Sequence, residues 1–250
     1  MAKRAKTIVK RVAVGALVLA VLLTAACAWY FSIYYHASEP ALKAMADENG
    51  GADGVAVREL SDKTVAFVPN DPVAGLVFYP GAKVEPAAYA LLLTRCAERG
   101  ILCVLVEPRL NFALLDEDAA DGVQEQFPQV EEWMIGGHSL GGVAATDYLA
   151  RHMDEYDDVV LLAARSKEDL TGFGGEILLV RGTNDEIVNL ELYEQARDNY
   201  PEDVREVTIA GGNHAYFGDY GEQDGDGTAT ISRDDQQRQC VDAIVELVDE

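Results

Sequence analysis

Short apolar runs that alternate with helical stretches constrain the fold of this chain more than any other feature. Runs rich in Val, Leu and Ile predict strands at residues 73–79, 101–107, 132–137, 158–164, 175–181 and 206–210. Strands that are apolar throughout are typical of a parallel sheet that helices cover on both faces. Helices are expected at residues 86–99, 111–126, 140–153, 190–200 and 234–248, and two short strands at residues 55–60 and 64–69. The pattern predicts an α/β fold with a mostly parallel sheet and helices on both faces.

The N-terminal segment differs from the rest of the chain. Residues 12–35 are apolar apart from Thr24 and Ser32, and this length can cross a hydrocarbon core of about 30 Å. Five basic residues precede the run and favour a cytoplasmic N-terminus, with the remainder outside. We expect residues 1–35 to form a basic tail and transmembrane anchor, residues 36–54 a polar tether, and residues 55–250 one α/β domain.

Two other fates of this segment are compatible with the sequence. Ala26, Cys27 and Ala28 are small enough for a cleavage site, so the domain could be secreted after signal removal. Lipidation of Cys27 is a further alternative. The leading prediction is a single-pass anchor in the cell membrane with an extracytoplasmic domain.

Charge and cysteine content exclude several classes of partner. The net charge is −23, and five of the 20 basic residues precede residue 12, so 15 basic residues face 43 acidic ones in the remainder. Such a domain repels phosphate backbones, and we expect no nucleic-acid partner.

The spacing of Cys96, Cys103 and Cys240 is not that of a metal site, and their number is odd. We predict no metal and no other cofactor, and leave open whether Cys96 and Cys103 pair.

A glycine-rich motif lies between a predicted strand and a predicted helix. Gly137, Ser139 and Gly141 form G-x-S-x-G. A serine in this context occupies a strained, exposed turn, and the flanking glycines remove side chains that would collide with the strand and helix. The motif predicts that Ser139 is a catalytic nucleophile.

A serine hydroxyl needs a base, which is most often histidine. The chain has four histidines: His36 borders the membrane segment, His152 lies within a predicted helix, and His138 is expected to point off the other side of the serine turn. His214 directly follows the last predicted strand, at the sheet edge where ligands bind. Elimination and position therefore favour His214 as the base.

The third group should be a carboxylate that orients the imidazole. Asp185 follows the predicted strand at residues 175–181, and the chain order Ser, Asp, His is typical of one class of serine hydrolase. Glu186, Asp219 and Asp224 are the alternatives. We predict Asp185 as the third member.

Acyl transfer also needs N–H donors for the oxyanion. The backbone N–H of Leu140, directly after the serine, is one expected donor. The second is expected from Ala82, or alternatively Lys83, in the loop after the first long strand, where Gly81 permits close backbone approach.

From residue 73 onward the chain resembles the α/β-hydrolase superfamily, in particular a compact bacterial, membrane-anchored group with dienelactone-hydrolase-like and small esterase-like members. The motifs that carry the resemblance are Tyr79-Pro80-Gly81, Gly137-His138-Ser139-Leu140-Gly141-Gly142, Gly182-Thr183-Asn184-Asp185 and Gly212-Asn213-His214. The segment at residues 217–227 resembles one that follows the histidine in some anchored members. Only residues 165–174 separate two predicted strands where a cap is often inserted, so we expect no large cap and an open pocket.

These observations predict a carboxylesterase-like serine hydrolase that acts on a small-molecule acyl substrate through an acyl-enzyme on Ser139. Two alternatives remain: acyl transfer to an acceptor other than water, and a catalytically silent domain that keeps the fold for binding.

Overall fold

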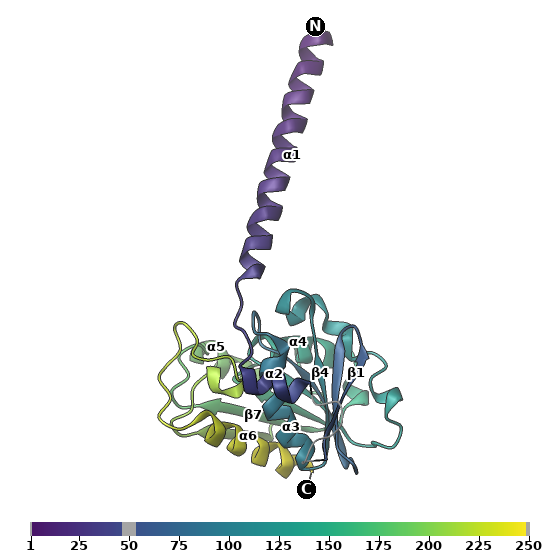
Figure 1. The fold of residues 1–250 in the computed structure, drawn as a ribbon, viewed down its shortest axis with the longest axis vertical. Coiled ribbons are helices and arrows are strands. Elements are labelled where there is room, and N and C mark those ends of the chain that lie inside the picture. The colour runs from purple at the N-terminus through teal and green to yellow at the C-terminus, as the bar shows by residue number, and fades with distance from the viewer. Residues whose placement is uncertain (1, 47–53, 249–250) are drawn as a thin grey trace. The chain divides into compact units, whose positions relative to one another are not determined.

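The computed structural model describes residues 2–46 and 54–248. The chain divides after Tyr34 into two compact units. The first contains one long helix, α1 (Ala2–Ser32), drawn in purple in Figure 1. Within it, Ala13–Ser32 is long and apolar enough to cross a membrane, with a mean hydropathy of 2.2. A signal sequence near the N-terminus has the same length and composition.

The second unit is built on one eight-stranded sheet in the order β1-β2-β4-β3-β5-β6-β7-β8. All neighbouring strands are parallel except that β2 runs antiparallel to β1 and β4. The strands are β1 (Ala56–Ser61), β2 (Thr64–Val68), β3 (Ala74–Tyr79), β4 (Ile101–Val106), β5 (Trp133–His138), β6 (Asp158–Leu162), β7 (Glu176–Gly182) and β8 (Val204–Ile209). The predicted mostly parallel α/β architecture is confirmed.

Helices cover both faces of the sheet (Figure 1). They are α2 (Glu39–Met45), α3 (Ala90–Glu98), α4 (Leu140–Leu149), α5 (Leu190–Gln195) and α6 (Arg233–Val248). Successive strand residues alternate between two apolar clusters: Met134 packs in the cluster that includes α3 and α6, and Ile135 in the cluster that includes α4 and α5. Burial on both faces explains why these strands are apolar throughout. No large cap interrupts the described chain between β6 and β7.

The expected helix at residues 111–126 is wrong. This stretch forms short 3-10 turns: Arg109–Asn111, Ala113–Leu115, Glu117–Ala120 and Gln124–Gln126. Leu110 and Asn111 have positive φ, which starts the segment outside helical geometry. The buried carboxylate of Asp116 then accepts from the backbone N–H of Arg109 and pairs with Lys63 at 2.9 Å. These contacts stabilise a compact loop in place of a helix.

Residues 35–46 pack on the domain, which differs from the expected tether at residues 36–54. The N–H of Tyr35 donates to the carbonyl of Lys83 at 2.7 Å, and the carbonyl of Tyr35 accepts from Glu85 at 2.9 Å. Ser38 caps α2 through its hydroxyl, and α2 buries Ala41 completely. Residues 47–53 of the expected tether lie outside the described residues.

Two smaller expectations are refined. The helices expected at residues 86–99 and 190–200 each contain a 3-10 turn, Pro86–Tyr89 before α3 and Ala196–Asn199 after α5. Cys96, Cys103 and Cys240 are buried free thiols, so Cys96 and Cys103 do not form a disulfide in this structure.

Candidate active site

Ser139 lies at the turn between β5 and α4, with φ 53° and ψ −124°. A positive φ is rare and strained for a residue with a side chain. The flanking glycines are required by close backbone contacts: a Cβ on Gly137 would lie 2.5 Å, and one on Gly141 2.2 Å, from the carbonyl oxygen of Tyr79. The structure therefore holds Ser139 in the tight strand-to-helix turn that the motif predicts.

His214 and Asp185 form a buried pair. His214 Nδ1 lies 2.8 Å from Asp185 Oδ2, and the two side chains are 1% and 2% exposed. The second carboxylate oxygen, Oδ1, accepts from the backbone N–H groups of Ile187 and Val188, each at 2.9 Å. Because a carboxylate only accepts, Nδ1 of His214 is the donor, and Nε2 of the neutral ring remains as an acceptor.

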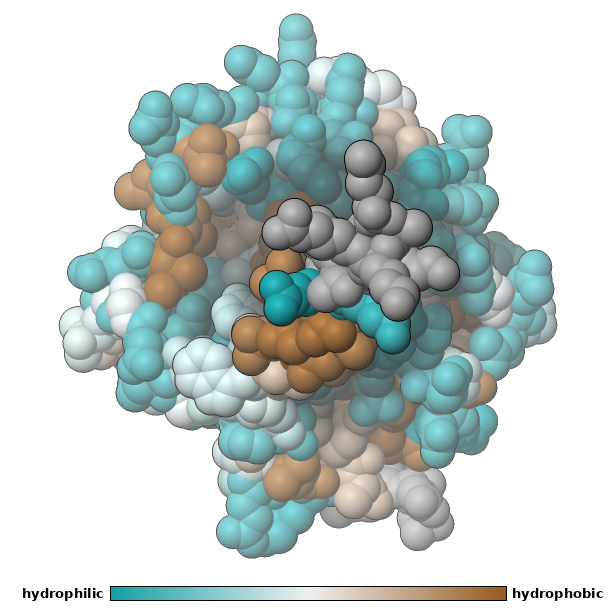
Figure 2. Space-filling view, turned by 90° about the horizontal axis from the view of Figure 1, so that it is seen from above, coloured by the Kyte–Doolittle hydropathy of each residue, from teal (hydrophilic) through white to brown (hydrophobic). Residues whose placement is uncertain are grey.

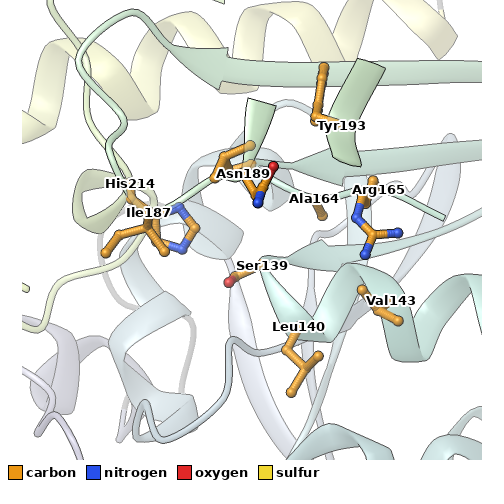
Figure 3. A pocket seen from close by; sticks show the side chains of 11 residues that line it. Ser139, Leu140, Val143, Ala164, Arg165, Ile187, Asn189, Tyr193 and His214 are labelled. Carbon is orange, nitrogen blue, oxygen red and sulfur yellow. The ribbon is translucent and has the colours of Figure 1, made fainter. Parts of the chain in front are cut away.

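Ser139 and His214 line one cavity of about 180 Å³ (Figure 3). Ser139 follows β5, and His214 lies in the loop after β8, so both come from the carboxyl edge of the sheet. The other lining residues are Leu140, Val143, Ala163, Ala164, Arg165, Ile187, Val188, Asn189 and Tyr193. The arrangement places a hydroxyl, an imidazole acceptor and a mostly apolar surface around one small space.

The alternative acids do not pair with His214. Asp219 Oδ2 accepts from Gln237 Nε2 at 2.8 Å, while Glu186 and Asp224 are exposed. Asp185 is the carboxylate that the structure brings to the imidazole.

The loop after β3 packs on the serine turn, because a Cβ on Gly141 would also lie 2.4 Å from the carbonyl oxygen of Pro80. The N–H of Lys83 donates to the carbonyl of Asn111 at 2.7 Å, so the alternative oxyanion donor is already engaged. Among the described residues, the N–H groups of Ala82 and Leu140 have no hydrogen-bond acceptor. Leu140 lines the cavity, whereas Ala82 is not among its lining residues.

His138 is not among the residues that line the cavity, and its ring packs beside the His–Asp pair. Its ring is buried, with its centroid 4.5 Å from that of His214. The N–H of Gly81 donates to Tyr89 Oη at 3.0 Å, and Tyr89 Oη is hydrogen-bonded to His138 Nδ1 at 2.8 Å. Burial, and then the neighbouring His214, lower the pKa of His138 well below its usual value, and burial raises the pKa of Tyr89. A neutral network thus connects the loop after β3 with the ring of His214.

The sequence also gave no indication of the role of Asp226, which connects the loop after β7 with the loop after β8. Its carboxylate accepts from the N–H of Ala215 at 2.8 Å and from the N–H of Glu186 at 3.3 Å. Gln236 accepts from the N–H of Asn213 and donates to its carbonyl. The segment at residues 217–227, noted in the sequence only as a resemblance, therefore has a structural role beside the His–Asp pair.

No three His, Cys, Asp or Glu side chains in the described part of the chain are grouped so that they could hold a metal ion.

The sheet order, the strained serine turn after β5 and the His–Asp pair after β7 and β8 define the class of protein: an α/β-hydrolase fold. The family model described as "Alpha/beta hydrolase family" matches residues 75–238, more than half of the chain, and the chain belongs to this family. Membership confirms the superfamily predicted from the motifs; the membrane-anchored subgroup remains a prediction. No curated protein matches the sequence.

Solved structures share the fold at low identity. Est1E from Butyrivibrio proteoclasticus is 14% identical with a TM-score of 0.56, covering 79% of this chain and 100% of its own. A dienelactone hydrolase-like promiscuous phosphotriesterase, P91 from metagenomic libraries, is 16% identical with a TM-score of 0.57, covering 74% and 91%. An S-formylglutathione hydrolase from Agrobacterium tumefaciens is 11% identical with a TM-score of 0.54, covering 79% and 96%. At this identity the similarity establishes the fold alone.

Proposed function

We propose that this protein is a serine hydrolase that cleaves a carboxylic ester through an acyl-enzyme on Ser139. The observation that carries the proposal is the 2.8 Å contact between His214 Nδ1 and Asp185 Oδ2, behind a cavity that Ser139 and His214 both line. A third group that fixes the imidazole is what distinguishes an activated serine from a serine in an ordinary turn.

The proposed reaction has two halves, formation and hydrolysis of the acyl-enzyme, and His214 and the oxyanion donors act in both. His214 Nε2 accepts the Ser139 hydroxyl proton as Oγ attacks the carbonyl carbon, and the carbonyl oxygen gains the negative charge. The N–H groups of Leu140 and Ala82 donate to that oxyanion. The imidazolium, stabilised by Asp185, then gives its proton to the leaving alcohol, which leaves the acyl group on Oγ. Water attacks the acyl-enzyme by the same route and releases the acid.

The shape of the site supports a small-molecule acyl substrate. The lining is mainly apolar, and no large cap is inserted between β6 and β7 in the described chain. Two of the similar structures are named for hydrolysis of different bonds, a formyl thioester and a phosphotriester. The fold therefore does not select the ester, and specificity must lie in the side chains of the cavity.

Labelling with a fluorophosphonate probe and turnover of 4-nitrophenyl esters test the proposal. The wild-type protein should be labelled and active, and Ser139→Ala should lose both, with kcat lower by roughly 10⁴-fold or more. Ser61→Ala is a matched control, since this serine lies on the distant edge strand β1. Far-UV circular dichroism should show an unchanged fold in both variants.

Two results would reject the proposal. A wild-type protein that is neither labelled nor active on any ester would indicate a silent binding domain. Retained labelling in Ser139→Ala would place the nucleophile elsewhere.

A further inference from the structure

Arg165 differs from the other residues around the cavity because it carries a permanent charge. Among the residues that the structure describes there, it is the only Lys, Arg, Asp or Glu. It lies three residues beyond the end of β6, the strand that pairs with β5, and the N–H of Ser139 donates to the carbonyl of Leu162 at the end of β6. Arg165 lines the cavity, and in Figure 3 it and His214 lie on opposite sides of Ser139.

The backbone that presents Arg165 is strained. Ala163, two residues earlier, has φ 47°, and its N–H donates to the carbonyl of Val180 at 2.7 Å. A non-glycine residue in the left-handed region costs about 1 kcal/mol or more, and such strain is found preferentially at functional sites. The turn after β6 is therefore held in place beside the nucleophile by backbone contacts on both sides.

The guanidinium has no carboxylate partner among the described residues, in a chain with 43 acidic and 20 basic residues. The other arginines of the domain are mostly ion-paired: Arg95, Arg99, Arg109, Arg151, Arg181, Arg197, Arg205 and Arg238. Where acidic side chains are this abundant, a half-buried and unpaired arginine in the cavity is free to pair with a ligand.

We propose that Arg165 binds a carboxylate carried by the substrate, so that the preferred substrates are esters with a negatively charged group on their acid or alcohol part. The inference rests on the proposed ester hydrolysis at Ser139. A guanidinium presents two parallel donors that match a carboxylate, and the same cavity has a mainly apolar lining that would accept the rest of an ester. One cation in the lining offsets one charge, which favours a monoanionic carboxylate over a dianionic phosphate.

The test compares esters that differ only in charge. On the acid side, 4-nitrophenyl hydrogen glutarate is compared with its neutral methyl ester and with the 4-nitrophenyl ester of 4-(trimethylammonio)butyric acid. On the alcohol side, the butyrate ester of glycolic acid is compared with that of methyl glycolate. We expect the wild-type protein to prefer the anionic member of at least one pair by kcat/KM, and the pair that responds identifies the side that Arg165 binds.

Arg165→Gln should lower the anionic-to-neutral ratio of kcat/KM by roughly 10- to 100-fold, the effect expected when a hydrogen bond to a charged group is lost. Arg58→Gln is the matched control: it removes the same charge from an exposed residue on β1, which has no ion pair among the described residues, and should leave the ratio unchanged. An equal fall in Arg58→Gln would indicate a general charge effect and overturn the proposal.

The inference and the proposed function fail differently. Turnover of neutral esters with no anionic preference, or a preference for the cationic ester, refutes the role of Arg165 and leaves Ser139 as nucleophile. Absence of turnover and of fluorophosphonate labelling refutes both.

Discussion

At the scale of single residues, the two carboxylate oxygens of Asp185 have different hydrogen-bond partners. Oδ1 accepts from two backbone N–H groups, which fixes the carboxylate, and Oδ2 faces His214 Nδ1. Asp185→Asn should lower kcat by roughly 10³- to 10⁴-fold, because an amide no longer selects the tautomer that leaves Nε2 as the base. Steady-state kinetics check this. Glu186→Gln, at the exposed neighbour, should change kcat little. A large fall in kcat for Glu186→Gln and a small one for Asp185→Asn would identify Glu186 as the third member of the triad.

His138 should make stability depend on pH. Its folded pKa lies below its usual value because the ring is buried, whereas in the unfolded chain it is about 6.5. Below about pH 6.5 the unfolded chain therefore binds a proton that the folded protein excludes, so stability falls as pH falls. Protonation of His138 in the unfolded chain should lower the free energy of unfolding by up to about 1.4 kcal/mol between pH 7.5 and 5.5.

Urea unfolding at these two pH values measures this effect. The free energy of unfolding of the wild-type protein should fall more than that of His138→Gln, which cannot titrate. Equal falls in the two proteins would show that His138 is protonated in the folded state.

At the scale of elements, the segment between His214 and α6 braces the loops that carry the His–Asp pair. Asp226 accepts from backbone N–H groups of both loops. Asp226→Ala should lower kcat by roughly 10- to 100-fold through misplacement of His214, since small displacements of catalytic groups are costly. Asp224→Ala is the matched control, because this exposed side chain belongs to the same segment. Loss of stability with unchanged kcat in Asp226→Ala would show that the contact serves folding alone.

The segment at residues 35–46 should contribute to domain stability. Tyr35 pairs with the loop after β3, and its ring lies 5.5 Å from that of Tyr220. A chain that begins at Tyr35 should be folded and active on water-soluble esters. A chain that begins at residue 47 should have a Tm lower by about 5 °C or more, because it loses α2 and these contacts. Equal melting temperatures would show that the segment is a tether after all.

At the scale of the whole molecule, we expect the N-terminal helix to anchor the protein in a membrane. Full-length protein should fractionate with membranes, and external protease should release the domain from intact cells, because the basic N-terminus favours the cytoplasmic side. Protein found in the medium and cut near Ala28 would identify a signal peptide. A domain that external protease cannot reach would invert the topology.

The net charge of the chain affects which substrates can approach it. Hydrophilic residues form most of the rim of the face seen in Figure 2. Long-range repulsion by so acidic a domain opposes approach of anions, so an anionic substrate requires a local cation at the site. The unpaired guanidinium of Arg165 meets that requirement.

The sequence by itself determined the sheet, the serine turn and the positions of His214 and Asp185. Apolar runs indicate burial on both faces, glycine spacing indicates a tight backbone turn, and residues that follow parallel strands meet at one edge. These signals are local, or depend only on the direction of the strands, so they can be interpreted without knowing which loops touch.

The tertiary structure alone decided the contacts between distant segments. It placed His138 against His214, connected Asp226 to two loops, packed residues 35–46 on the domain and left Arg165 unpaired in the cavity. It also formed 3-10 turns at residues 109–126 around the buried Asp116 carboxylate. Contacts such as those of His138 with His214 and of Asp226 with Glu186 join residues far apart in sequence. Periodicity does not specify such partners, because it reports only how much of a residue is buried.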